Sequence, residues 1–109
     1  MATKANLIID QGSSFTTTIT LTNDDDTILD LTGYTGAGQI RKWYTSSNAV
    51  NFTVTIAPAS GEVTLQLTAN ATANMSAGRY VYDVELTIGA TISRVLEGLI
   101  TVTPEVTRI

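Results

Sequence analysis

Charged side chains are closely spaced in the last third of the chain, as acid–base chemistry would require. The group comprises Arg79, Asp83, Glu85, Arg94 and Glu97. Two carboxylates that face each other across a cleft can hydrolyse a glycosidic bond. On two paired strands the same residue types form cross-strand ion pairs, which are far more common. No insertion that could build a cleft accompanies them, so we expect ion pairs and no catalytic residue.

Three consecutive aspartates, Asp24, Asp25 and Asp26, form a second acidic group. Clustered carboxylate oxygens bind Ca²⁺, but adjacent residues point in different directions and no glutamate follows at the spacing of an EF-hand loop. Aspartate also favours turns, because its side chain hydrogen-bonds the nearby backbone. We therefore expect a solvated hairpin loop, with no metal and no cofactor.

Basic and aromatic residues adjoin each other at Arg41, Lys42, Trp43 and Tyr44. In a strand, Ile40 and Lys42 share one face, while Arg41 and Trp43 share the other. Ile40 is the better core residue, so Trp43 should point away from the core. An exposed tryptophan can anchor a protein contact, or it can stack on a sugar ring together with Tyr44. We expect Arg41, Trp43 and Tyr44 to belong to a contact with a partner.

The composition excludes several classes of function. The 109 residues include no cysteine and no histidine, which excludes zinc fingers, haem ligation, thiol catalysis and histidine triads. The formal net charge is −4 and no cluster of lysine or arginine offsets it, so we expect no nucleic-acid partner. The apolar run at residues 7–9 is too short for a signal peptide or a membrane span, so we expect no membrane partner.

Alternation of apolar and polar side chains predicts the elements that position these groups. A period of two places one face of a strand in the core and the other in water or against a partner. The expected strands cover residues 7–10, 14–22, 27–31, 36–44, 50–56, 62–67, 79–87 and 91–103. An alanine-rich stretch near residues 68–76 predicts one short helical turn.

Turn signals recur along the chain at the spacing that is typical of a β-sandwich or a small barrel. The sequence therefore predicts an all-β fold, an immunoglobulin-like antiparallel β-sandwich of about seven or eight strands, with residues 1–109 as a single domain. Tyr80 or Tyr82 is placed to form the tyrosine corner of such a sandwich. Gly98, inside the last strand, predicts a β-bulge or a close backbone approach.

Two segments near the chain ends are candidate sheet edges. An exposed edge is a template on which another chain can pair. We expect one edge at residues 7–10, with Leu7 and Ile9, and another at residues 101–108, with Val106, followed by Ile109. These four side chains and the group around Trp43 make up the expected partner contacts.

Five stretches of the chain form a recognisable series: residues 9–15, 30–34, 39–42, 77–86 and 97–104. In this order they resemble small immunoglobulin-like virion proteins of tailed bacteriophages. The family includes the N-terminal domains of baseplate upper proteins and the tail or fibre-attachment modules of cyanobacterial phages. The five stretches mark strand and turn positions, and none of them is a catalytic motif.

The resemblance implies a non-enzymatic structural or assembly subunit of a phage particle, most simply in the tail, the baseplate or a fibre junction. Its partners would be other virion proteins and copies of itself. The chain would be made in the host cytoplasm and would reside in the virion. Two alternatives stay open: a decoration or cement protein of the capsid, and a carbohydrate-binding module that attaches to host polysaccharide.

Overall fold

The structure is a computed structural model that describes residues 3–23, 25, 27–44 and 49–106. These residues form nine strands, one α-helical turn and one 3-10 turn. In chain order the elements are β1 (Thr3–Lys4), β2 (Leu7–Asp10), β3 (Phe15–Thr20), β4 (Thr35–Arg41), β5 (Val50–Asn51), β6 (Thr53–Ala57), η1 (Pro58–Ser60), β7 (Glu62–Leu67), α1 (Ala69–Ala73), β8 (Gly78–Ile88) and β9 (Thr91–Thr103).

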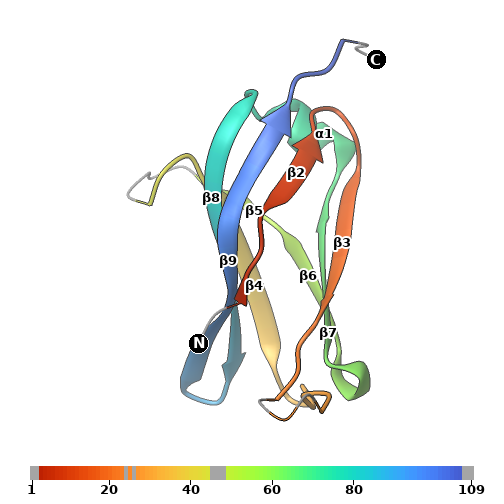
Figure 1. Ribbon diagram of the computed structural model, residues 1–109, viewed down its shortest axis with the longest axis vertical. Helices are drawn as coiled ribbons and strands as arrows, with labels where there is room; N and C mark the ends of the chain where they lie inside the picture. Colours follow the sequence, from red (N-terminus) through yellow and green to blue (C-terminus); the bar gives the residue numbers. More distant parts are fainter. Residues whose placement is uncertain (1–2, 24, 26, 45–48, 107–109) are drawn as a thin grey trace.

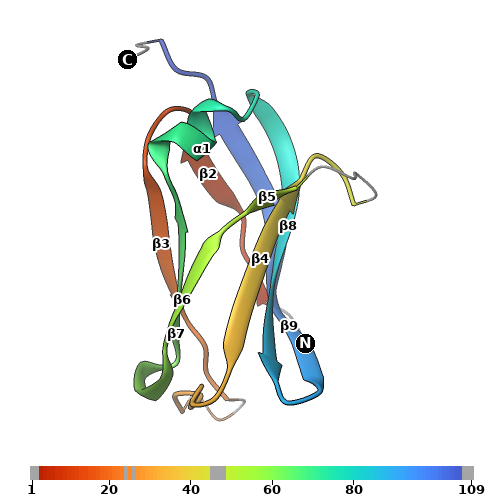
Figure 2. The same cartoon turned by 180° about the vertical axis from the view of Figure 1, so that it is seen from behind.

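The strands form two sheets that pack face to face (Figures 1 and 2). One sheet has the order β1-β9-β8-β4-β5, with β2 also paired to β9, and the other has the order β3-β7-β6. In the described residues the nine strands form seven extended stretches, because β1 and β2 both line β9, and β5 and β6 are consecutive pieces of one stretch that contributes to both sheets. The prediction of an all-β sandwich is confirmed.

The first strands differ from the predicted antiparallel arrangement, because β1 and β2 both run parallel to β9. Gly98 makes this pairing possible, since a Cβ at that position would overlap the carbonyl oxygen of Ala5. The close backbone approach predicted at Gly98 is therefore correct. The bulge lies three residues earlier, at Val95, where Val84 pairs with Leu96 but the next residue, Glu85, pairs with Arg94.

The predicted strand at residues 50–56 is real, but it changes sheets at Phe52. Val50 pairs with Ile40 of β4, whereas Val54 pairs with Leu65 of β7. The Phe52 amide donates to the carbonyl oxygen of Gly38 at 2.9 Å and ties the crossing to β4. The sandwich is therefore closed by continuous chain along this side, as Figure 2 shows.

The predicted strand at residues 27–31 is wrong: that stretch contains only an isolated bridge, between Thr22 and Ile28. Aspartate side chains fold it back instead. One oxygen of Asp30 accepts hydrogen bonds from the Thr32 amide and hydroxyl, at 3.0 and 2.7 Å, and Asp25 binds Thr27 in the same way. These local bonds compete with a strand ladder and make turns at Asp25 and Asp30, on either side of the single bridge.

The predicted helical turn is present as α1, and it closes one end of the sandwich. The Thr68 hydroxyl caps it by accepting a hydrogen bond from the Ala71 amide at 3.1 Å. Thr72 is fully buried and donates its hydroxyl to the carbonyl oxygen of Ser13 at 2.8 Å. The turn is thereby joined to the loop before β3.

Aromatic residues hold the centre of the sandwich. Tyr80 donates its hydroxyl to the carbonyl oxygen of Ser76 at 2.7 Å, four residues upstream, which is the hydrogen bond of a tyrosine corner. Tyr82 is buried and donates to the carbonyl oxygen of Ala5 at 2.6 Å. Its ring meets Phe52 edge-on, with the centroids 6.0 Å apart, and Phe52 also contacts Phe15.

Candidate interaction surface

A groove at the end of β4 brings an exposed tryptophan beside apolar side chains. Its volume is about 380 Å³. Trp43 is 58% exposed, while Ile40 and Met75 are buried and form apolar parts of the lining. The residues of this Trp43 groove are Ile40, Lys42, Trp43, Ala49, Val50, Asn74, Met75, Ser76 and Tyr80.

The local path of the chain differs from the predicted alternation at this point. β4 ends at Arg41 and the chain bends at Lys42 and Trp43, so the strand is shorter than predicted. Because of the bend, Trp43 lines the same groove as Ile40 and Lys42, and the prediction that it shares a face with Arg41 is wrong. Its predicted position outside the core is correct.

Lys42 is the one ionisable cation that lines the Trp43 groove among the described residues. Its ammonium group lies 4.6 Å from the centre of the Tyr80 ring, a cation–π contact. The Tyr80 hydroxyl is in turn bound to Ser76, which is a groove residue too. The groove therefore has a wall fixed by these contacts, with a positive charge next to exposed aromatic surface.

Tyr44 lines a different hollow, on the outer face of the first sheet. This hollow has a volume of about 300 Å³, and it is polar where the Trp43 groove is apolar. Arg41 lies in it and donates to the side-chain oxygen of Gln39 at 2.9 Å. Trp43 and Tyr44 line separate hollows, so they do not combine into one flat stacking platform.

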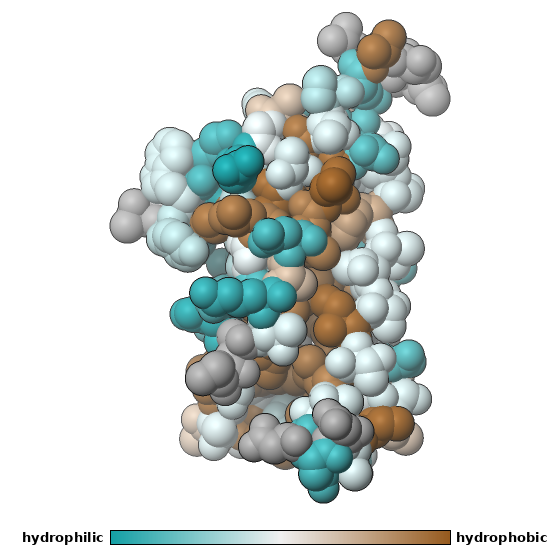
Figure 3. Space-filling model, viewed as in Figure 1, coloured by the Kyte–Doolittle hydropathy of each residue, from teal (hydrophilic) through white to brown (hydrophobic). Residues whose placement is uncertain are grey.

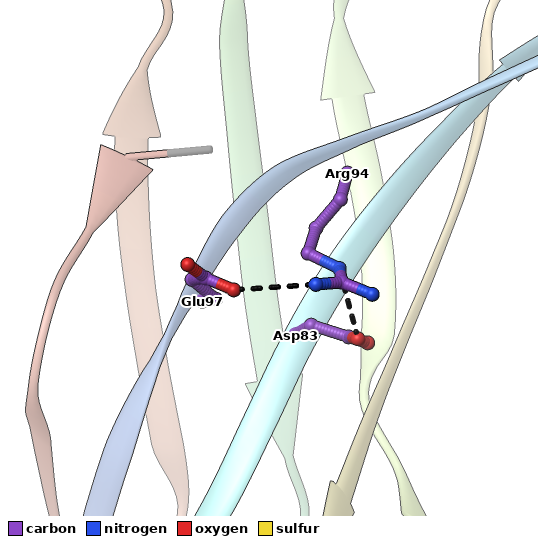
Figure 4. Close-up of polar contacts among 3 residues, drawn as sticks. All are labelled: Asp83, Arg94 and Glu97. Atoms are coloured by element: carbon purple, nitrogen blue, oxygen red, sulfur yellow. Dashed lines mark hydrogen bonds and ion pairs between the residues drawn. The ribbon is translucent and has the colours of Figure 1, made fainter. Parts of the chain in front are cut away.

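Four of the five charged residues predicted on the last two strands line this second hollow, and Figure 4 shows three of them, Asp83, Arg94 and Glu97. Arg94 lies 3.4 Å from a carboxylate oxygen of Asp83 on the neighbouring strand and 3.4 Å from one of Glu97. The prediction of cross-strand ion pairs is confirmed for Arg94 and Asp83. Glu85 lines the same hollow, whereas Arg79 lies opposite Thr101, further along β8.

The predicted edge contacts are only partly placed as expected. Ile9 is fully buried and packs in the core, so its assignment to a partner contact is wrong. Leu7 is half-buried against the same core. Val106 is 96% exposed beyond the last strand, as Figure 1 shows for the end of the described chain, and Ile109 lies outside the described residues.

The two predicted edges also differ from each other. β2 pairs with β9 on one side, and no described strand pairs with it on the other. The predicted edge at residues 101–108 begins inside β9, and this first part is not an edge. Thr101 pairs there with Ile8 of β2 on one side and with Arg79 of β8 on the other. Ile8 is a contact candidate that the sequence reasoning missed at this edge, since it is 68% exposed on the outer face of β2. Side chains alternate between the two faces of a strand, so Ile8 points away from the face that carries Leu7 and Ile9, and this pattern could have identified it.

No cluster of three potential metal ligands occurs among the residues that the structure describes. Of the three predicted loop aspartates, Asp25 is described, and Asp24 and Asp26 lie outside the described residues. Hydrogen bonds from the hydroxyl and the amide of Thr27 lower the pKa of the Asp25 carboxyl below its usual value. Within the same described residues, no helix has the length and hydropathy to cross a bilayer.

The chain is similar in structure to InlP of Listeria monocytogenes. The TM-score is 0.52 at 13% sequence identity. The similarity covers 94% of this chain and 28% of the InlP chain, so the present sequence corresponds to a minor part of that protein. At this identity the similarity supports the fold alone. No protein-family model and no curated protein matches the sequence.

Proposed function

We propose that this chain is a non-enzymatic structural subunit of a tailed-bacteriophage particle, located in the tail, the baseplate or a fibre junction. The Trp43 groove is its contact site for a neighbouring virion protein. The observation that carries the proposal is the exposed Trp43 beside the buried Ile40 and Met75. The resemblance of the sequence to phage virion proteins supplies the biological setting.

The groove has the features of an interface anchor. Binding energy at protein interfaces concentrates in a few aromatic or arginine side chains, set among apolar contacts that exclude water. Trp43 supplies the aromatic surface, and Val50 and Met75 supply apolar neighbours. Lys42 adds a charge beside it, which suits a partner that presents a carboxylate next to an apolar side chain.

The scaffold around the groove is suited to assembly. The groove is built from β4, the start of β5, the start of β8 and the segment after α1, so it joins four parts of the fold. Hydrogen bonds from Tyr80 to Ser76 and from Gln11 to Met75 hold the segment after α1 in place. A preorganised contact surface loses little conformational entropy on binding, which favours stable association.

Attachment to polysaccharide is less well supported by the same geometry. Sugar rings are bound by aromatic side chains that lie together, and here Trp43 and Tyr44 line different hollows. The Tyr80 ring, the other aromatic group of the groove, is covered by Lys42. Trp43 alone would offer one stacking surface.

Labelling of intact particles tests the proposal. Particles produced from the genome that encodes this chain would be purified, labelled with an antibody against the chain and viewed by electron microscopy. We expect label at the tail or its base, with a copy number set by tail symmetry. Label spread over the head in proportion to its surface would indicate a capsid decoration protein instead. Particles that contain none of the chain would refute a virion role.

A further inference from the structure

Among the described residues, no strand pairs with β3 on the edge that faces away from β7. β3 pairs with β7 from Phe15 opposite Leu67 to Thr20 opposite Glu62, without a shift of register. The strands that precede β3 in the chain, β1 and β2, pair with β9 in the other sheet. Figures 1 and 2, taken from opposite sides, both show β3 as the lateral boundary of the molecule.

This edge carries none of the features that usually prevent strands from associating. Natural sheet edges are protected by charged side chains, proline, bulges or a covering segment. β3 consists of Phe15, three consecutive threonines, Ile19 and Thr20, with no charge, no proline and no bulge in its pairing with β7. In Figure 3 the margin that corresponds to β3 is mostly pale, which indicates residues of intermediate hydropathy.

The sequence of β3 is compatible with pairing to itself in the antiparallel direction. Thr16, Thr18 and Thr20 are exposed on the outer face of the sheet. A two-fold register centred on Thr17 places Thr16 opposite Thr18 of the other copy, and a register centred on Thr18 places Thr16 opposite Thr20. The fold already contains such a contact, because the Thr18 and Thr64 hydroxyls lie 2.9 Å apart across β3 and β7. In the register centred on Thr17, Phe15 would face Ile19 of the other copy, a favourable aromatic and β-branched pair.

The other edge of the same sheet is less available. β6 follows directly from β5, which belongs to the other sheet, so the chain itself occupies that corner. Val54 of β6 packs closely on β4: a Cβ on Gly36 would lie 2.7 Å from its Cγ1 atom. β6 also ends at Ala57, where Pro58 begins the 3-10 turn.

We infer that β3 is a homotypic docking edge: β3 of one copy pairs antiparallel with β3 of a second copy, and the β3-β7-β6 sheet continues across a two-fold axis. The occupant is a second copy because the edge is complementary to itself and carries no charge that would select a different partner or repel its own kind. Each chain has a net charge of −4, but β3 itself contains no ionisable side chain. Pairing of two β3 strands would therefore bring no like charges directly together. This inference does not depend on the phage assignment.

Sedimentation velocity of the purified chain over a range of concentrations tests the inference. The wild type should show a monomer–dimer equilibrium. Thr18→Lys should weaken the dimer about fivefold, because the two lysines would lie beside the two-fold axis, diagonally across it in the register centred on Thr17 and directly opposite each other in the register centred on Thr18. Thr55→Lys is the matched control: Thr55 is exposed in the same cross-strand row, on the far side of Thr64, and its dimer should match the wild type.

A charge swap makes the test specific for β3. An equimolar mixture of Thr18→Lys and Thr18→Glu should form a mixed dimer that is tighter than the dimer of either variant alone, and added salt should reduce the difference. A wild-type chain that stays monomeric at every concentration would overturn the inference. So would a dimer that survives Thr18→Lys and is lost in Thr55→Lys or in Trp43→Ala.

Discussion

Tyr82 connects the core of the sandwich to its first strands through one hydroxyl group. The phenol donates to the carbonyl oxygen of Ala5 at 2.6 Å, and the ring lies edge-on to Phe52. Burial raises the pKa of the Tyr82 phenol from 10.0 to about 12. The folded protein therefore keeps this proton at pH values where the unfolded chain loses it.

This shift predicts an alkaline decline of stability. The folded pKa is raised, so the contribution of Tyr82 is complete below pH 10 and is lost as the pH rises toward 12. Urea unfolding of the wild type at a series of pH values should show this decline. Tyr82→Phe should remove that part of it and cost about 1 kcal/mol at neutral pH through loss of the hydrogen bond. An identical alkaline decline in the variant would contradict the assignment.

Gly98 is the residue on which the parallel pairing of the first strands depends. Gly98→Ala should displace Ala5 from β9, because the added Cβ would overlap its carbonyl oxygen, and should cost about 2 kcal/mol of stability. Hydrogen exchange should localise the loosening to β1 and the start of β2.

Gly89→Ala is the matched control for this prediction. Gly89 has open space where the Cβ would be added, and its φ of 57° gives only a local backbone cost of about 1 kcal/mol. In the Gly89→Ala variant, hydrogen exchange should therefore become faster at the β8–β9 turn and stay unchanged in β1. Loosening of β1 to the same extent in both variants would show that Gly98 has no special role.

At the scale of elements, the crossing at Phe52 joins the two sheets. Its ring contacts Phe15 of one sheet and Tyr82 of the other, and 6% of the residue is exposed. Phe52→Ala should therefore destabilise the fold by about 3–5 kcal/mol, because it leaves a cavity between the sheets. Chemical denaturation measures this change.

Trp43→Ala is the matched aromatic control, since Trp43 lies outside the core and is 58% exposed. We expect a cost below about 1 kcal/mol for that variant. Equal costs for the two variants would mean that the Phe52 crossing is not a central part of the packing.

The elements that follow strict alternation were predictable from the sequence. β7 and the β8–β9 hairpin match their predicted ranges closely, because one face of each strand is buried and the period of two holds, apart from the bulge at Val95 in β9. The segment at residues 27–31 is also rich in apolar residues, yet Asp30 bonds the backbone two residues ahead and forms a turn. The hydrophobic pattern contains no information about the competition between such side-chain hydrogen bonds and strand pairing.

The candidate site was predictable in part for a related reason. An exposed tryptophan after a core isoleucine was identified correctly, because alternation holds up to Arg41. The bend at Lys42 and Trp43 was missed, and with it the groove, since the groove depends on β5, β8 and the segment after α1. Parallel pairing of β2 with β9 is likewise a long-range contact that no local pattern specifies.

For the whole molecule, the two proposed contacts lie on different sides. The Trp43 groove is at the end of β4, and β3 is the opposite lateral boundary in both ribbon views. One copy can therefore pair through β3 and still present Trp43 to another protein. A two-fold dimer with two outward anchors would bridge neighbouring subunits of a larger assembly.

The most direct test of the central claim, that the protein acts through the Trp43 groove, is the incorporation of variants into particles. Wild-type and Trp43→Ala chains would be expressed together during infection, and their ratio in purified particles measured by mass spectrometry. Loss of an anchor worth about 2 kcal/mol predicts about 30-fold depletion of Trp43→Ala. Tyr44→Ala, which changes an aromatic residue of the other hollow, should be incorporated like the wild type. Incorporation of Trp43→Ala in proportion to its expression would contradict the account.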